Sequence, residues 1–150
     1  MGRKKKLLKI MNGIVKDAAI PKEHNVIWWD VENIAFSLKE KEERWLRKHH
    51  IAVRGFMGCK YSHRFLREDD TRFVRYPTQV GEQSDHAISL YTGRWVQSIL
   101  SRGLRTDDIK TCVMTQDRRF GDAWAVVLQH NGIHAERVKD WEGIKHFFHK

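Results

Sequence analysis

The sequence predicts a doubly wound three-layer α/β domain with a mostly parallel central sheet of about five strands. Short apolar runs alternate along the chain with amphipathic stretches of about 10–17 residues, which is the pattern of βαβ units. The 150 residues, 41% of them hydrophobic, are enough to bury the core of one such domain. Because crossovers between parallel strands are right-handed, we expect helices on both faces of the sheet.

The first half of the chain predicts three strands and two helices. Residues 26–30 (VIWWD) are an apolar run that ends in an acid, as a buried strand does. Residues 34–50 combine helically spaced apolar side chains with a glutamate-rich face, which predicts a helix. Residues 51–56 predict a second strand, and residues 61–70 a short helix after a glycine-containing loop. Residues 72–77 predict a third strand, which a proline ends.

The second half begins with a predicted helix over residues 85–101, for which Ser84 is a suitable N-cap. The remaining elements are a strand over 110–116, a helix over 120–131, a strand over 133–138 and a helix over 141–149. The pair Asn131-Gly132 is expected to end its helix with a left-handed residue.

The positive charge is concentrated in a basic N-terminal arm, residues 1–22, before a predicted domain of residues 23–150. The chain has 28 Lys+Arg, 19 Asp+Glu and a net charge of +9, and no acid occurs within residues 1–16. The cations of that stretch are Arg3, Lys4, Lys5, Lys6, Lys9 and Lys16. Such an arm favours a polyanionic partner such as nucleic acid. The alternatives are a solvated tail or an amphipathic helix at a membrane surface.

Composition and motifs exclude several classes of protein. No apolar run approaches the ~18 residues of a membrane helix, and the start of the chain lacks the apolar stretch of a signal peptide. Two cysteines argue against a disulfide scaffold, so we expect a reducing, cytoplasmic setting. The nine histidines lack zinc-ligand spacing. A phosphatase with an aspartyl nucleophile is a weak alternative, since no Asp-Asp pair follows a later apolar strand.

Carboxylates follow three of the predicted strands. Asp30 ends the first strand, Asp85 follows the third across a short loop, and Asp117 follows the fourth. Because parallel strands end at one edge of the sheet, these acids are expected to lie near one another there. Crowded carboxylates repel unless a cation lies between them, and Mg²⁺ or Mn²⁺ is the ordinary solution. The chemistry indicated is hydrolysis of a phosphodiester.

Each acid also has a purely structural interpretation. Asp85 and Asp117 lie at helix starts, where an aspartate caps backbone N–H groups. Asp30 is harder to explain in this way, because a carboxylate directly after four apolar strand residues is desolvated and needs a partner. Asn33 is either the N-cap of the next helix or a neutral group that orients a metal-bound water. Glu32 is expected to point away from Asp30 if the backbone stays extended, and therefore to be structural.

Three segments in order resemble the motifs of NYN domains, in particular the limkain type, within the PIN-like nuclease superfamily. They are VIWWDVENI, EQSDHAISLY and CVMTQDRRFGDAWAVVLQHNGIHAERV, and the resemblance spans about residues 25–140. It implies a Rossmann-like PIN fold with an acidic Mg²⁺ or Mn²⁺ site that cleaves RNA, mostly single-stranded. By position, Asp30, Asp85 and Asp117 match the acids of the family and Asn33 its asparagine.

The chain departs from the family at two acidic positions. Tyr91 stands where the family often has a further acid, and Arg118-Arg119 interrupt the acidic pattern of the last motif. Asp122 is out of register, so we do not expect it to be a ligand. The alternatives are therefore a one-ion nuclease or an RNA-binding or adaptor domain that kept the fold without the chemistry.

Several cations are candidates for contact with RNA. Arg118 and Arg119 would lie beside the scissile phosphate, where guanidinium groups pair with phosphate oxygens. The segment 55–67 mixes Lys60, His63 and Arg64 with an aromatic residue, as single-stranded nucleic-acid sites do, although an exposed helix explains it equally well. We therefore expect a metal-dependent endoribonuclease that is aided by the basic arm, and whose selectivity is either low or supplied by a protein partner. A DNA nuclease is a further alternative, because no residue is identified that would read the 2′-hydroxyl.

Overall fold

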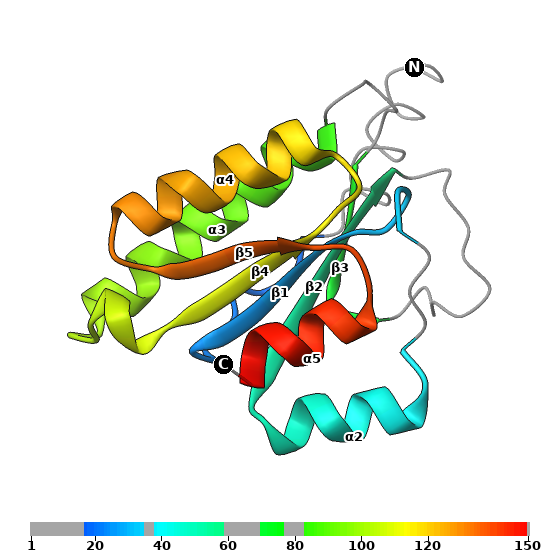
Figure 1. Cartoon of the computed structure of the whole chain (residues 1–150), viewed down its shortest axis with the longest axis horizontal. Coiled ribbons are helices and arrows are strands. Elements are labelled where there is room, and N and C mark those ends of the chain that lie inside the picture. The colour runs from blue at the N-terminus through cyan, green and yellow to red at the C-terminus, as the bar shows by residue number, and fades with distance from the viewer. Residues whose placement is uncertain (1–16, 35–37, 59–69, 77–82, 150) are drawn as a thin grey trace, which may run out of the picture.

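The computed structural model describes residues 17–34, 38–58, 70–76 and 83–149, which form a five-stranded parallel sheet (Figure 1). The strands lie in the order β3-β2-β1-β4-β5, and all four neighbouring pairs are parallel. Their bounds are β1 Asn25–Asp30, β2 Ile51–Gly58, β3 Phe73–Tyr76, β4 Lys110–Met114 and β5 His134–Val138. The predicted α/β class with five parallel strands is confirmed.

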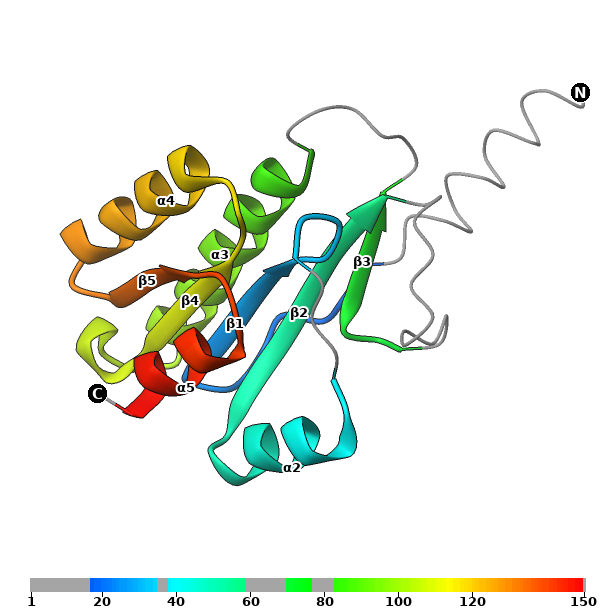
Figure 2. The same cartoon turned by 45° about the vertical axis from the view of Figure 1, so that its right-hand side comes forward.

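Within the described residues, four α-helices cover the two faces of the sheet, two on each side (Figures 1 and 2). Helices α3 (Gln83–Ser101) and α4 (Arg118–His130) lie side by side on one face, and α2 (Glu40–Lys48) and α5 (Trp141–His149) cover the other. A short 3-10 helix, η1 (Thr106–Asp108), precedes β4. The described part of the chain contains no helix long and apolar enough to cross a membrane.

Adjacent tryptophans of β1 anchor the two cores, because successive side chains of a strand point to opposite faces. Trp28 packs under α3, with its ring centroid 6.0 Å from that of Trp95, and its indole N–H donates to Thr111 Oγ1 at 2.7 Å. Trp29 packs on the other side against Phe73, with centroids 5.7 Å apart. Both tryptophans are fully buried, so β1 is the central strand of the core as well as of the sheet.

The predicted helix over 34–50 begins only at Glu40, so its N-terminal part is wrong. Directly after β1 the chain turns, because the backbone N–H groups of Asn33 and Ile34 both donate to the Asp30 carbonyl at 3.2 Å. Lys39 is still extended, and the helical turn that follows begins with Glu40, Glu42 and Glu43, which complement the positive end of the helix dipole.

Smaller differences concern other element ends. Ser84 is not an N-cap, because α3 already begins at Gln83. Helix α4 begins at Arg118 rather than at residue 120, and β4 ends at Met114 rather than at residue 116. The left-handed residue after α4 is Gly132, with φ +78°, as predicted. The helix expected over 61–70 lies outside the described residues except for Asp70, which is not helical.

Residues that precede β1 pack against the domain. Ala18 is buried in the core under α3, and the hydroxyl group of Tyr91 donates to the carboxylate of Asp17. The Ala19 carbonyl accepts from Arg54 Nε at 2.8 Å. The stretch from Asp17 onward is therefore part of the folded unit.

The strand order fixes where a ligand site belongs. The chain passes from β1 to β2 on one side and returns to β4 on the other, so the connections diverge at β1 and β4. In open α/β sheets, ligands bind at the carboxyl ends of the strands where the order reverses in this way. The residues that follow β1 and β4 are therefore the first candidates for a site.

Candidate active site

Asp30, the last residue of β1, has a fully buried carboxylate at this point of divergence. Its Oδ2 accepts two hydrogen bonds, from Asn33 Nδ2 at 2.6 Å and from Thr115 Oγ1 at 3.1 Å. Asn33 is placed by the turn after β1, and Thr115 directly follows β4. Asn33 is thus bound to Asp30 and is not the N-cap of α2, which begins seven residues later at Glu40.

The second carboxylate oxygen, Asp30 Oδ1, is buried and has no hydrogen-bond partner among the described residues. Burial raises the pKa of Asp30 above its ordinary value of 3.8. The hydrogen bonds from Asn33 and Thr115 and the nearby Ser84 hydroxyl act in the opposite direction, but desolvation has the larger effect. The negative charge of Asp117 raises the pKa further. An unpartnered buried carboxylate oxygen needs either a proton or a cation.

Asp117 is connected to Asp30 through the hydroxyl group of Thr115. That hydroxyl donates to Asp30 and accepts from the Asp117 backbone N–H at 3.1 Å. Asp117 is also the N-cap of α4, since its Oδ1 accepts from the Phe120 backbone N–H at 3.0 Å. The structural interpretation of Asp117 as a helix cap is therefore confirmed, and its proximity to Asp30 is an additional feature.

A hollow of about 350 Å³ opens between the first turns of α3 and α4. Its lining residues are Asp85, His86, Ser89, Asp117, Arg119 and Phe120. The structure thus brings Asp85 and Asp117 to one hollow, as the sequence predicts. Asp30 lies outside this lining, and its link to the hollow runs through Thr115 and Asp117.

Tyr76, at the end of β3, lies close enough to the acids of this sheet edge for their charges to affect its pKa. Its hydroxyl group donates to Ser84 Oγ at 3.0 Å. Burial raises the pKa of Tyr76, and the negative charges of Asp30, Glu32 and Asp85 raise it further. The backbone turns after β1 instead of staying extended, so the condition under which Glu32 was expected to point away from Asp30 is not met.

The donors at this edge suit a hard divalent cation. Mg²⁺ prefers carboxylate oxygens and is commonly held by one or two carboxylates, with water and substrate phosphate completing its shell. Asp30 offers an unpartnered oxygen, and Asp85 and Asp117 share a hollow. Across the described ranges, no group of three or more His, Cys, Asp or Glu is arranged to hold a metal ion. Asp30, Asp85 and Asp117 are therefore the candidate oxygen donors for such a cation at this edge.

Only two of the cations that were predicted to bind RNA lie within the described residues. Arg118 and Arg119 are exposed in the first turn of α4, and Arg119 lines the hollow with the two acids. The other predicted contacts lie outside the described residues, namely Arg3, Lys4, Lys5, Lys6, Lys60, His63 and Arg64. Asp122, which is exposed, forms an ion pair with the mostly buried Arg137, 3.4 Å between Oδ1 and Nε.

Two residues of this region were missed by the sequence analysis. His86 lines the hollow, and its position directly after Asp85 on a predicted helix start was the available signal. Tyr76 was seen only as part of a strand, although it ends that strand at the same sheet edge as Asp30. Tyr91, which stands where the family often has an acid, is buried in the core. Its ring centroid lies 5.3 Å from that of Phe56.

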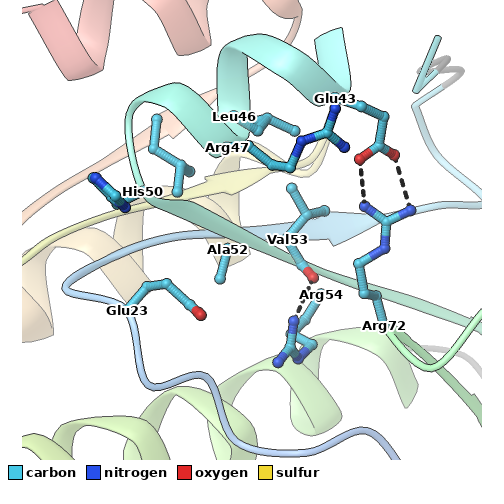
Figure 3. A pocket seen from close by; sticks show the side chains of 10 residues that line it. Glu23, Glu43, Leu46, Arg47, His50, Ala52, Val53, Arg54 and Arg72 are labelled. Carbon is cyan, nitrogen blue, oxygen red and sulfur yellow. Dashed lines mark hydrogen bonds and ion pairs between the residues drawn. The ribbon is translucent and has the colours of Figure 1, made fainter. Parts of the chain in front are cut away.

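A second hollow, of about 320 Å³, lies between α2 and the first half of β2 (Figure 3). Arg72, just before β3, forms two-pronged ion pairs there with Glu43 of α2 and with Asp70. These pairs raise the pKa of Arg72 and tie the start of β3 to α2. We assign this cluster a structural role.

Comparison with models of known protein families, with curated proteins and with solved structures finds no match to this chain. The fold and the residues at its sheet edge therefore carry the functional argument.

Proposed function

We propose that this chain is a metal-dependent endoribonuclease that hydrolyses phosphodiester bonds of single-stranded RNA and acts in the cytoplasm. The observation that carries the proposal is the buried Asp30 carboxylate with one unpartnered oxygen, at the point where the strand order diverges. The resemblance of the sequence to NYN domains supports the same reaction, since Asp30, Asp85 and Asp117 match the acids of that family.

In this proposal each of the polar residues at the sheet edge has a separate role. Asn33 and Thr115 hold Asp30 Oδ2, and Oδ1 would be the oxygen available to bind a cation. Asp85 and Asp117 add negative charge and further oxygen donors at the adjoining hollow. Mg²⁺ or Mn²⁺ would supply polarisation of a phosphodiester oxygen and activation of a water molecule.

Arg119 is the residue best placed to bind the phosphate group. It lines the hollow with both acids, and a guanidinium group pairs with phosphate oxygens in a planar, two-pronged geometry. A cation in the first turn of a helix is unfavourable for the helix dipole, so Arg118 and Arg119 weaken α4 locally. We infer that both are retained for binding. Specificity for a particular RNA would come from a protein partner.

A second candidate is an RNA-binding or adaptor domain without hydrolytic activity. The observation that favours it is the burial of Asp30 outside the hollow lined by Asp85 and Asp117, together with a cation, Arg119, where the family pattern has an acid. In that case Asp30, Thr115 and Asp117 would only join the ends of β1 and β4 to the start of α4.

The two candidates differ in a cleavage assay on labelled single-stranded RNA with and without Mn²⁺. For the nuclease, we expect Mn²⁺-dependent cleavage that both Asp30→Asn and Asp117→Asn abolish. Asp122→Asn is the matched control, because it neutralises an exposed acid of the same helix outside the hollow. Binding without cleavage by all four proteins would reject the nuclease in favour of the adaptor. A labelled single-stranded DNA of the same sequence, cleaved equally fast, would replace RNA as the substrate class.

A further inference from the structure

A third hollow, which is apolar and has a volume of about 350 Å³, lies between α3 and α4. Its walls include Thr92 and Gly93 of α3 and Trp124 and Val127 of α4. Val127 is 62% exposed, so this wall presents an apolar side chain to solvent. The Trp124 indole is held in place, because its N–H donates to Thr92 Oγ1 at 3.1 Å.

Gly93 lines this hollow, and the fold does not require a glycine at this position. It lies inside helix α3, where its backbone does not have a positive φ, and a Cβ built on it meets no atom of the described structure within 4 Å. Glycine inside a helix is about 1 kcal/mol less favourable than alanine. Since neither backbone nor packing requires glycine here, its effect is to leave space between the helices.

The apolar hollow adjoins the acidic one. Ser89 and Phe120 line both of them, and both open between the same two helices. At about 1.5 Å per helical residue, Gly93 lies about 12 Å along α3 from Asp85. A ligand whose anionic part meets Arg119 can therefore extend an adjoining flat group into the apolar hollow.

The walls match the chemistry of a nucleobase. A base has two apolar faces and a polar edge, and proteins that bind single-stranded nucleic acid hold it by stacking on aromatic rings. Phe120 is a half-buried aromatic ring at the junction of the two hollows, and Val127 supplies an apolar wall. The Ser89 hydroxyl group is a polar partner at the junction.

We propose that the hollow over Gly93 is a base-binding subsite, which holds one base of the single-stranded RNA whose phosphate lies at the acidic hollow. The inference rests on the proposed function, because it assumes that RNA binds at that hollow. It adds a residue, Gly93, through which the protein makes contact with the base rather than with the backbone.

The test compares binding of intact and abasic RNA. A short fluorescein-labelled single-stranded RNA, and the same RNA without bases, are titrated with protein in Ca²⁺ and followed by anisotropy. Gly93→Leu fills the hollow and should preserve α3, since leucine is the better helix former. The matched control is Gln97→Leu, an exposed position one turn further along α3 that does not line the hollow.

We expect Gly93→Leu to weaken binding of intact RNA at least about fivefold, since stacking of one base contributes ~1–3 kcal/mol. Abasic RNA should bind the native protein more weakly, and Gly93→Leu should not weaken that binding further. Gln97→Leu should behave like the native protein.

Four outcomes would overturn the subsite. Equal binding of intact RNA by the native protein and Gly93→Leu, while the native protein cleaves RNA, rejects the subsite and leaves the proposed function standing. An equal loss on intact and abasic RNA shows that Gly93 does not act through a base. Conversion of a dimer into a monomer by Gly93→Leu in sedimentation, with RNA binding unchanged, identifies the hollow as a self-association surface. Failure of the native protein to bind either RNA rejects the subsite and the proposed function together.

Discussion

Asp30→Asn is expected to stabilise the protein while abolishing its activity. The amide oxygen can take over both hydrogen bonds that Oδ2 now accepts from Asn33 and Thr115. The NH₂ group then replaces Oδ1, which has no partner among the described residues, and it points its donors toward the nearby Ser84 hydroxyl. The substitution therefore removes a buried charge and keeps the shape and the hydrogen-bond acceptor.

The size of the effect follows from two opposing contributions. Hydrogen bonds to a charged acceptor contribute ~1.5–3 kcal/mol and neutral ones ~0.5–1.5 kcal/mol, so two weakened bonds cost about 2 kcal/mol. Burial of the ion itself costs several kcal/mol. The raised pKa of Asp30 indicates that the cost of burial exceeds the gain from the hydrogen bonds. We expect a net gain of about 1–2 kcal/mol at neutral pH, or a Tm higher by about 2–8 °C.

The gain should depend on pH in a defined direction. Because the folded state holds the Asp30 proton to a higher pH than the unfolded state, native stability falls as pH rises from about 4 through the raised pKa. Asp30→Asn lacks this titration, so its advantage should be near zero below pH ~4 and largest at neutral pH. Thermal unfolding at both pH values measures the difference, and Asp122→Asn, at an exposed position, should show almost none.

Addition of Mn²⁺ tests the functional half of the same prediction. A cation that binds only the folded state raises the Tm, and saturation to about 100 times Kd adds ~2.7 kcal/mol of stability. The native protein should show this shift and Asp30→Asn should not. The reasoning is refuted if Asp30→Asn is less stable than the native protein at neutral pH, because Asp30 would then be a structural carboxylate.

Three further predictions concern glycine, the helix cap and RNA contacts. Gly55→Ala should lower the free energy of unfolding by about 1–3 kcal/mol, because its Cβ would lie 2.3 Å from the Phe73 ring. Gly93→Ala should instead raise the free energy of unfolding by about 1 kcal/mol. Chemical denaturation measures both changes, and two changes of the same sign would contradict the packing argument. Asp117→Asn should keep the α4 cap and change the free energy of unfolding little, whereas Asp117→Ala should lower it by about 1 kcal/mol. A large loss of stability in Asp117→Asn would show that the negative charge itself stabilises the fold. Arg119→Ala should weaken RNA binding and reduce the slope of log K against log salt concentration by about 1. Deletion of residues 1–16 should reduce this slope further. If neither change alters the slope, Arg119 and residues 1–16 do not belong to the RNA-binding surface.

The fold class was readable from sequence because it depends on periodicity. Each buried strand of a parallel sheet is a short continuous apolar run, and the helices between strands carry their apolar residues on one face. Residues 26–30 and 141–149 were therefore located to within a residue. The start of α2 was not, because the turn after Asp30 is held by hydrogen bonds to its own carbonyl, and apolar spacing does not report such bonds.

The candidate site was predictable only in part. Position after a strand was sufficient to name Asp30, Asp85 and Asp117, since parallel strands end at the same edge. It did not distinguish a lining residue from a buried one, and the structure puts Asp85 and Asp117 at the hollow while Asp30 lies outside its lining. The orientation of Glu32 was predicted for an extended backbone, and the structure has a turn after β1 instead.

The order of apolar and polar residues along this chain determined how many layers it forms and which acids follow its strands, because burial of apolar surface is a local property of the pattern. Only the tertiary structure decided that Thr115 joins Asp30 to Asp117, that one oxygen of Asp30 has no partner in the described structure, and that the hollow over Gly93 adjoins the acidic one. These are contacts between segments up to 85 residues apart. Their geometry is set when β1 and β4 pair and α3 packs beside α4, and no single segment contains it.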